Sequence, residues 1–288
     1  MTTFADGEKS LVGYVRQLTS ADLADLEVLL RSDPVTNCFL DARVRGAGVD
    51  PWRLGGDIWG YFDDEALQSV VYTGANLVPI GTTPASRAAF ADRLRMGPRR
   101  CSSFVGDRDE VLDMWRLLEP AWGPAREVRE DQRLLVMDTE SSVSGDPLVR
   151  PATIADMDVL VPACIDMFTE EVGISPVRGG GGAAYRARIE EIVRAGRSFV
   201  RIVDGRIEFK AEIGAATPDA CQVQGVWVAP ELRGQGLSVP AMASVVHLTR
   251  LSIAPVVSLY VNSFNTAALR TYASVGFRPY GHFATVLF

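Results

Sequence analysis

The spacing of apolar residues predicts a series of helices and strands in the second half of the chain. Helical spacing, as at Ala184, Ile189 and Ile192, alternates with short apolar runs bounded by turn residues. The predicted helices cover residues 153–167, 183–195, 237–250 and 266–274. The predicted strands cover residues 198–203, 206–216, 221–228, 256–261 and 283–288, with Asp204-Gly205 as a hairpin turn.

The first half of the chain predicts a similar order of elements. Its helices are expected at residues 21–30, 36–45, 84–95 and 108–117, and its strands at 58–62, 69–73, 76–80, 101–105 and 134–138. The matching order suggests two copies of one α/β unit. The polar stretch 139–147 is typical of a linker. We therefore expect an N-terminal domain at 1–138, a linker at 139–147 and a C-terminal domain at 148–288.

Composition and charge narrow the range of functions. The length of 288 residues suits two domains, and 47% hydrophobic residues are enough for packed cores. The net charge of -7 argues against a nucleic-acid partner, which needs a clustered basic face, and suits a cationic amine. No apolar run is long enough for a membrane span, and the chain starts without a basic region ahead of an apolar run. No membrane partner and a cytoplasmic location are therefore expected.

The cysteines and histidines exclude several kinds of site. The isolated cysteines form no CxxC motif, which favours reduced, buried thiols. With only His247 and His282 available, neither a histidine-rich metal site nor a Ser-His-Asp triad is expected, so we predict no metal. The four cysteines are Cys38, Cys101, Cys164 and Cys221.

The most informative segment covers residues 226–238. A strand ends, glycines follow at Gly234 and Gly236, and a helix begins near Leu237. Glycine lets the main chain approach a ligand without a Cβ in the way. A helix N-terminus adds unpaired N–H groups and the positive end of the helix dipole. Because Arg233 supplies a fixed positive charge at the same place, this segment predicts a phosphate-binding loop.

A second motif follows one strand later. Asn265 is a good helix N-cap, and Gly276 is well placed to end that helix. Seven residues separate Asn265 from Tyr272, so both side chains point from about the same face of the helix. The pattern predicts an amide and a phenol along one groove, with a tyrosine packed in the core as the alternative.

Both motifs resemble those of the GCN5-related N-acetyltransferase (GNAT) superfamily. Residues 228–238, Val-x-Pro-x-x-Arg-Gly-x-Gly-x-Ser, are similar to its Arg/Gln-x-x-Gly-x-Gly/Ala signature, with Ser238 where Gly or Ala is usual. The run from Asn262 through Tyr272 to Gly276-Phe277 is similar to its second motif. The whole chain also resembles actinobacterial two-domain acetyltransferases with a degenerate N-terminal GNAT-like domain.

The resemblance implies an α/β (α+β) fold of two tandem GNAT-like domains. Each is expected to hold a mixed, mostly antiparallel sheet flanked by helices. In the C-terminal domain the parallel strands at 221–228 and 256–261 are expected to splay apart around acetyl-CoA. The implied cofactor-binding residues are Val226, Trp227, Val228, Arg233, Gly234, Gln235, Gly236, Leu237, Ser238, Asn262 and Asn265.

The resemblance also implies direct transfer of an acetyl group from acetyl-CoA to a primary amine in a ternary complex. Tyr272 is expected to protonate the departing sulfur, because a phenol with a pKa of about 10 stays protonated at neutral pH. Main-chain N–H groups near 226–228 are expected to stabilise the developing oxyanion. The expected acceptor is a small-molecule or peptide amine, whose identity stays open, as does formation of a homodimer.

The group that accepts the proton of the amine is uncertain from the sequence. Many relatives carry a glutamate in the strand before the loop, but this chain has Gln222 and Gln224, and an amide is no base. Glu212, on the preceding strand, is the nearest carboxylate by topology. A water chain, or no dedicated base, is also open. The other carboxylate candidates are Glu170, Glu171 and the C-terminus at Phe288.

Glycines elsewhere are harder to interpret. The run at 179–182 predicts either a loop that orders over the acceptor or a flexible connection. In the first half, residues 81–84 read Gly-Thr-Thr-Pro where a phosphate loop would fall, without an arginine or a second glycine. The segment 45–48, Arg-Gly-Ala-Gly, follows a helix and not a strand. The N-terminal domain is therefore expected to lack the chemistry and to shape acceptor access.

Two rival functions stay open. The missing glutamate motivates a CoA- or acyl-CoA-binding sensor or scaffold without turnover. The same fold would also suit an acyltransferase that acts on amino acids or uses a longer acyl group.

Overall fold

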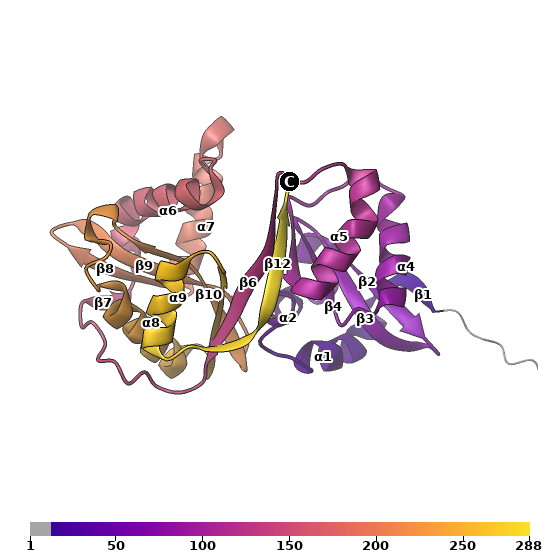
Figure 1. The fold of residues 1–288 in the computed structure, drawn as a ribbon, viewed down its shortest axis with the longest axis horizontal. Helices are drawn as coiled ribbons and strands as arrows, with labels where there is room; N and C mark the ends of the chain where they lie inside the picture. Colours follow the sequence, from indigo (N-terminus) through magenta and orange to yellow (C-terminus); the bar gives the residue numbers. More distant parts are fainter. Residues whose placement is uncertain (1–12) are drawn as a thin grey trace, which may run out of the picture. The chain divides into compact units, whose positions relative to one another are not determined.

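The computed structural model describes residues 13–288 and divides into two compact units that interleave along the chain (Figure 1). Unit 1 comprises the described part of Met1–Asp33 together with Arg43–Asp131 and Phe283–Phe288. Unit 2 comprises Pro34–Ala42 and Gln132–His282. These units do not follow the predicted boundaries at 138 and 148, because each includes a segment from the other half of the sequence.

Unit 1 is built on a sheet whose strand order is β1-β2-β3-β4-β5-β12. Only β4 and β5 pair in parallel, and the other neighbours are antiparallel. Its core contains Phe90, Phe104 and Met114. The strands are β1 Tyr14–Gln17, β2 Asp57–Asp63, β3 Ala66–Thr73, β4 Asn76–Ile80, β5 Ser103–Asp107 and β12 Arg278–Leu287. The helices are α1 Leu23–Arg31, α3 Pro51–Leu54, α4 Pro84–Arg95 and α5 Arg108–Trp122, while α2, Cys38–Ala47, crosses from unit 2 into unit 1.

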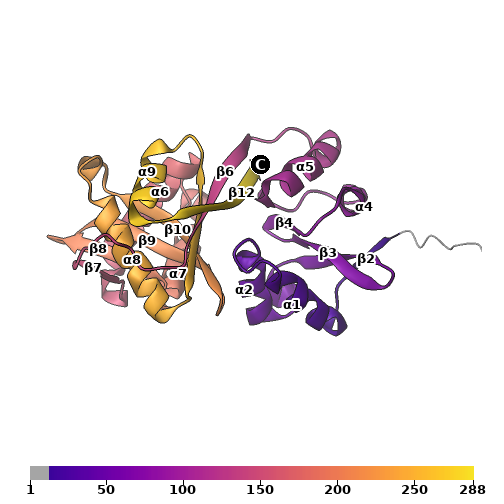
Figure 2. The same ribbon diagram turned by 60° about the horizontal axis from the view of Figure 1, so that its bottom comes forward.

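Unit 2 is built on a sheet whose strand order is β6-β11-β10-β9-β8-β7. The strands are β6 Glu127–Met137, β7 Val149–Pro151, β8 Ser198–Val203, β9 Arg206–Ala216, β10 Ala220–Val228 and β11 Val256–Asn262. The helices are α6 Met157–Val172, α7 Gly182–Arg194, α8 Ser238–Ser252 and α9 Thr266–Val275 (Figures 1 and 2). Figure 1 shows α6 and α7 apart from α8 and α9. One core cluster joins β9 and β10 to α8 and α9, and another joins α6 and α7 to β8.

The last strand of each half completes the sheet of the other unit. Residues 132–137 of β6, which precede the predicted linker, pair antiparallel with β11 in unit 2. Residues 283–287 of β12, predicted as a strand of the C-terminal domain, pair antiparallel with β5 in unit 1. The ring of Phe288 packs in unit 1 against Trp115 and Trp122, with centroids 5.5 and 6.1 Å apart. The sequence predicts these strands but not their partners.

The parallel strands β10 and β11 separate after three residues. They pair from Ala220 to Gln222 on β10 and from Val256 to Ser258 on β11, and both then continue without pairing to one another. The expected splay of two parallel strands is therefore confirmed. It leaves main-chain hydrogen-bonding groups of both strands facing a gap at the end from which the phosphate loop starts.

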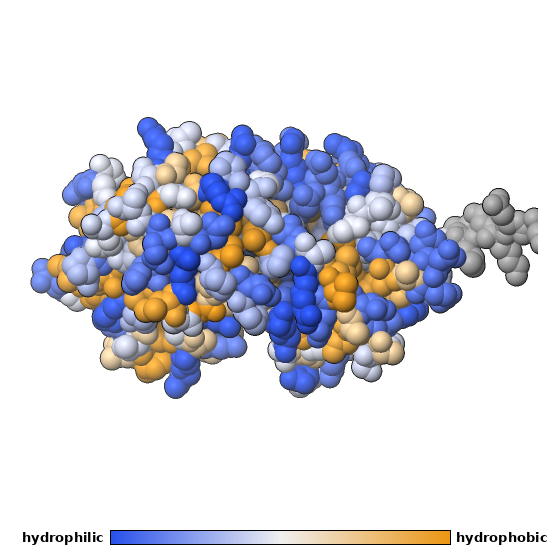
Figure 3. Space-filling model, turned by 90° about the horizontal axis from the view of Figure 1, so that it is seen from below, coloured by the Kyte–Doolittle hydropathy of each residue, from blue (hydrophilic) through white to orange (hydrophobic). Residues whose placement is uncertain are grey.

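Residues 13–288 contain neither a helix suited to span a membrane nor a cluster of side chains suited to bind a metal ion. No helix in that range is long and apolar enough to cross a bilayer, and no group of three or more His, Cys, Asp or Glu side chains in it is arranged to hold a metal ion. Figure 3 shows apolar areas separated by hydrophilic ones on the face that it presents.

Candidate active site

The loop between β10 and α8 is exposed, and two of its residues have a backbone conformation that only glycine adopts easily. Gly234 and Gly236 have φ angles of +74° and +82°, in the left-handed region. A Cβ built on either residue would meet no atom within 4 Å, and both residues are exposed. Conformation, and not crowding, therefore requires glycine at these two positions.

The loop presents main-chain donors without partners. Among the described residues, no acceptor is found for the backbone N–H groups of residues 234–238. Helix α8 begins at Ser238, one residue later than predicted, and its first turn contains no acidic side chain. Unpaired N–H groups at the positive end of a helix dipole are a binding site for an anion such as phosphate.

Arg233 lies at this loop but is engaged with a carboxylate of the protein. Its two terminal nitrogens contact the Glu170 oxygens at 2.6 and 2.7 Å, and its Nε donates to the Val228 carbonyl at 3.0 Å. Hydrogen bonding to Arg233 lowers the pKa of Glu170. Both side chains are about half exposed, and such pairs contribute at most about 1 kcal/mol. An anion bound at the loop can therefore compete for Arg233.

Other loop side chains brace the site. The Ser238 and Thr271 hydroxyls lie 2.9 Å apart and join α8 to α9, so the unusual serine has a structural partner. Gln235 donates to the Glu231 carbonyl at 2.8 Å, and Leu237 packs against the core. Of the loop side chains, Arg233 is the one whose charge suits an anionic ligand.

Asn265 and Asn262 have local partners. The Asn265 side chain caps α9 by accepting from the Ala268 N–H at 3.1 Å, as predicted, and Gly276 ends the helix with φ +117°. The Asn262 Oδ1 accepts from Gln132 Nε2 at 2.9 Å. Asn265 is exposed, so its NH₂ group faces solvent while its oxygen is used.

Tyr272 is a buried phenol. It is 7% exposed, and its ring packs edge-on against Phe277 at 5.7 Å. Among the described residues no hydrogen bond to its hydroxyl is found. Burial raises the pKa of Tyr272 above its ordinary value, and the negative charge of Glu171 adds to this effect. The phenol therefore keeps its proton throughout the neutral range.

Strand β10 carries a bulge at Gly225 and Val226. In the ladder with β9, Gln224 lies opposite Glu212 and Trp227 lies opposite Lys210, so two residues face one. Gly225 has φ +58°, which a residue with a side chain adopts only with strain. Val226 and Val228 pack against one core cluster and Trp227 against the other. The side chains at 226–228 are thus structural, and their main chain is left for a ligand.

Glu212 lies beneath this bulge, as its position on β9 predicts. It is 7% exposed, and its Oε1 accepts from the Lys210 ammonium at 2.7 Å and from the Cys164 thiol at 3.4 Å. Its Oε2 lies 3.5 Å from the point that a Cβ on Gly225 would occupy. The sequence interpretation missed Lys210, although a lysine two residues before a glutamate on an apolar strand was a usable signal.

Two of the other candidate bases are placed less favourably, whereas the charge of Glu171 acts on Tyr272. Glu170 is paired with Arg233, and Phe288 lies in unit 1. Gln224 is exposed and Gln222 is buried on the strand that precedes the loop. Among the candidates, Glu212 is the one brought to the bulge.

The glycine run at 179–182 forms a short turn before α7. Gly179 and Gly180 have φ angles of +71° and +90°, and a Cβ on either would meet nothing within 4 Å. Ordering of this turn over an acceptor stays a prediction.

In the corresponding loop of unit 1, side chains of the protein already bind the main-chain groups. This loop also joins one of two parallel strands, β4, to a helix, α4, and contains a single glycine, Gly81. The Thr82 N–H donates to Glu110 Oε1 at 3.1 Å, and Arg87 binds the Thr82 carbonyl at 2.8 Å and Asp113 at 3.1 Å. Burial, followed by the charge of Asp107, raises the pKa of Glu110 to about 7. A carboxyl group of the chain thus occupies the place where an anion would approach.

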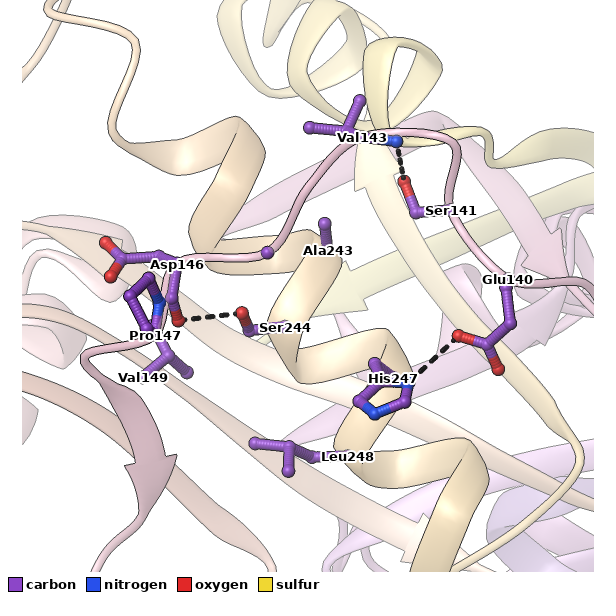
Figure 4. A pocket seen from close by; sticks show the side chains of 11 residues that line it. Glu140, Ser141, Val143, Asp146, Pro147, Val149, Ala243, Ser244, His247 and Leu248 are labelled. Carbon is purple, nitrogen blue, oxygen red and sulfur yellow. Dashed lines mark hydrogen bonds and ion pairs between the residues drawn. The ribbon is translucent and has the colours of Figure 1, made fainter.

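A separate cavity of about 270 Å³ lies along α8 beneath residues 140–149 (Figure 4). There Ser244 donates to the Asp146 carbonyl at 2.9 Å, and His247 lies 3.1 Å from Glu140. The predicted linker is therefore fastened to unit 2. None of the candidate cofactor-binding or catalytic residues lines this cavity, so it is distinct from the phosphate loop.

Comparisons with known proteins agree with this geometry. Residues 185–277 match the family described as "Acetyltransferase (GNAT) family", and residues 56–160 match a domain of unknown function, DUF4081. No curated protein matches the chain.

Several solved structures share the fold over nearly the whole length. A GNAT-family acetyltransferase from Colwellia psychrerythraea is 12% identical with a TM-score of 0.56, covering 95% of this chain and 99% of its own. A GCN5-related N-acetyltransferase from Sphaerobacter thermophilus is 15% identical with a TM-score of 0.58, covering 96% and 95%. A tandem GNAT protein from the clavulanic acid biosynthesis pathway is 14% identical with a TM-score of 0.55, covering 96% and 98%.

At these identities the solved structures establish the fold alone, and the family match at 185–277 supports acyl transfer as the class of reaction. Residues 185–277 match the GNAT family, and the chain has the fold of these GNAT structures, one of which is a tandem GNAT protein.

Proposed function

We propose that this protein is an N-acetyltransferase that moves the acetyl group of acetyl-CoA directly to a primary amine. The observation that carries the proposal is the open loop at Gly234 and Gly236, placed where β10 and β11 separate. A diphosphate fits there, because the loop offers unpaired N–H groups, a helix N-terminus and a nearby arginine, and no side chain fills the space above the glycines.

Acetyl-CoA, when bound, supplies an acyl group activated as a thioester. The N–H groups of residues 234–238 and Arg233 would hold its pyrophosphate, with Arg233 exchanging Glu170 for phosphate oxygens. The unpaired edge of β10 at 226–228 would bind its pantetheine arm through the main chain, since the side chains there pack inward. Asn262, at the end of β11, and Asn265, at the N-terminus of α9, would also contact it.

Three groups of the chain would carry the chemistry. The Val226 N–H at the bulge would donate to the thioester carbonyl oxygen, where negative charge develops. The Tyr272 hydroxyl would protonate the departing sulfur, because its raised pKa keeps it neutral. Glu212 would accept the proton of the incoming amine, being the buried carboxylate at the bulge.

Direct transfer is favoured over a route through an acylated cysteine. Unit 2 contains Cys38, Cys164 and Cys221, and all three are buried. Burial raises the pKa of each thiol to about 12. The thiolate that a covalent route requires is therefore scarce at neutral pH.

Calorimetry with CoA and acetyl-CoA tests the proposal at its first step. Arg233→Ala is expected to weaken binding about 10-fold, as loss of one charge-assisted contact does. Arg194→Ala is the matched control, because Arg194 is also exposed and paired with a glutamate but lies at the end of α7. Absence of binding by the parent protein would remove the proposal, and an equal effect of both substitutions would remove the assignment of Arg233.

Release of free CoA in a panel of amines and peptides tests turnover and identifies the acceptor. The rival function, a CoA-binding sensor, is motivated by the missing glutamate in the strand before the loop, where the chain has Gln222 and Gln224. Tight binding of CoA with no product from any amine would favour the sensor.

A further inference from the structure

Lys210 is a fully buried lysine that the chemistry proposed above does not use. It lies on β9 with 0% of its side chain exposed. Its ammonium group donates to Glu212 Oε1 at 2.7 Å and to the main-chain carbonyl of Gly225 at 3.1 Å. A Cβ on Gly225 would lie 3.2 Å from the same nitrogen. The bulge of β10 therefore rests directly on this ammonium group.

The ammonium group is charged in spite of its burial. Burial pulls the pKa of Lys210 down, but the charge of Glu212, the neighbouring Cys164 and their hydrogen bonds pull it up by more, and the net pKa is raised. Burying such a pair costs several kcal/mol that two apolar side chains of similar volume would not cost. Packing alone gives no reason for a lysine at this position.

The contact with Gly225 fixes the direction of one peptide group. The C=O of Gly225 and the N–H of Val226 belong to the same planar, trans peptide and point in opposite directions. With the C=O held on Lys210, the Val226 N–H is directed away from Lys210. Val226 also has no partner in the ladder with β9, because the two-residue bulge takes it out of register. Its N–H group is therefore oriented by the contact with Lys210, at a residue that has no register partner on β9.

We propose that Lys210 is a positioning residue that holds the Gly225–Val226 peptide so that the Val226 N–H donates to the acyl carbonyl oxygen. A positive charge hydrogen-bonded to the C=O also polarises the peptide and strengthens its N–H as a donor. This inference rests on the proposed function, since it assigns the origin of the oxyanion contact within the same site.

Lys210→Met keeps the length of the side chain and removes the ammonium group. Because this substitution leaves Glu212 buried without its partner, the double variant Lys210→Met/Glu212→Gln is made beside it, which removes both charges. Glu212→Gln alone keeps the Lys210 nitrogen, which can donate to the Gly225 carbonyl as an ammonium group or as an amine. Ser258→Ala is the matched control, since Ser258 is also fully buried and donates to a β10 carbonyl, that of Cys221, at 2.9 Å.

The primary measurement is the infrared carbonyl band of bound acetyl-CoA labelled with ¹³C at the acyl carbon. In the parent protein, Glu212→Gln and Ser258→Ala, the band is expected at lower frequency than in solution, because a hydrogen bond weakens the C=O bond. In both proteins that lack Lys210 this shift is expected to be lost. The dissociation constant of CoA is expected to stay within about twofold in both, while kcat of Lys210→Met falls by roughly 100-fold, as for loss of one oxyanion donor. The double variant also lacks the proposed base, so it is judged by its carbonyl band and its CoA affinity.

The results separate the two levels of the argument. No binding of acetyl-CoA by the parent protein would overturn the proposed function. A shifted band in the parent that survives in the variants lacking Lys210 would overturn the inference alone. Loss of the shift in Glu212→Gln would also overturn it, because the Lys210 nitrogen that donates to the Gly225 carbonyl is still present there. Should Lys210→Met fail to fold, the double variant and Glu212→Gln decide between these outcomes.

Discussion

Removal of the Glu170 carboxylate is expected to tighten binding of CoA, although Glu170 contacts no proposed ligand. In the unliganded protein, both oxygens of Glu170 hold the two terminal nitrogens of Arg233. A diphosphate that uses Arg233 has to displace this carboxylate. Glu170→Gln keeps the shape of the side chain and abolishes the ion pair, so Arg233 is free before the ligand arrives.

The size of the gain follows from the exposure of the pair. The two side chains are 42% and 53% exposed, and pairs of this kind are worth about 0–1 kcal/mol. Removing the competition therefore strengthens binding by up to roughly fivefold. The gain should shrink as salt is added, because screening weakens an exposed pair in the parent protein already.

Calorimetric titration with CoA at low and at high salt measures this effect. Glu231→Gln is the matched control, because Glu231 acts on Arg233 only through its charge and makes no ion pair with it. Loss of either negative charge weakens the repulsion of the CoA phosphates, but only loss of Glu170 releases Arg233. The control therefore separates these two effects on affinity. Equal affinities of the two variants, or weaker binding by Glu170→Gln, would refute the exchange of Glu170 for phosphate.

Three other expectations concern single positions. Tyr272→Phe should lower kcat at unchanged CoA affinity and nearly unchanged stability, since no hydrogen bond of the hydroxyl is lost; a parent-like rate would discard its role as an acid. Because the pKa of Glu110 is raised from 4.5 to about 7, its contribution to stability is complete below pH 4.5 and is lost as the pH rises through 7. Urea titrations at pH 4.5 and 8 should show that loss, about 3 kcal/mol, in the parent and not in Glu110→Gln; equal pH dependence would contradict it. Gly225→Ala should destabilise the protein by about 1–3 kcal/mol, because alanine is strained at the φ angle of +58°. Unfolding at the same urea concentration as the parent protein would contradict strain at the bulge.

The sequence predicts features whose cause is local. The glycines at 234 and 236 need positive φ angles, and Asn265 caps the helix that follows it, so both can be recognised from a few neighbouring residues. The splay of the parallel strands β10 and β11 follows from the family resemblance. These structural features are the ones that the structure bears out, while the roles of the site residues stay predictions.

Features that depend on distant partners could not be predicted in this way. The apolar pattern of β6 and β12 is that of any buried strand, and it does not say in which sheet the strand pairs. From the sequence, Arg233 is expected to be a positive charge without a partner. Its ion pair with Glu170 depends on the position of α6, which the sequence does not give. The contact of Lys210 with Gly225 could not be predicted, because Gly225 lies on the neighbouring strand β10. The bulge at Gly225 becomes visible only from the pairing register of β10 with β9.

The two loops of this chain show why a carboxylate can either prevent or regulate anion binding. In unit 1, Glu110 Oε1 accepts from the Thr82 N–H and Glu110 Oε2 is buried, so a ligand would have to displace the carboxyl group from the main-chain donor. In unit 2, Glu170 is half exposed, and it contacts the Arg233 side chain and not the main-chain N–H groups of the loop. Its carboxylate can therefore rotate into solvent when phosphate binds. The difference lies in burial, since both groups are carboxylates beside a helix N-terminus. Unit 1 should therefore stay without CoA even where its loop is given an arginine, unless Glu110 is removed as well.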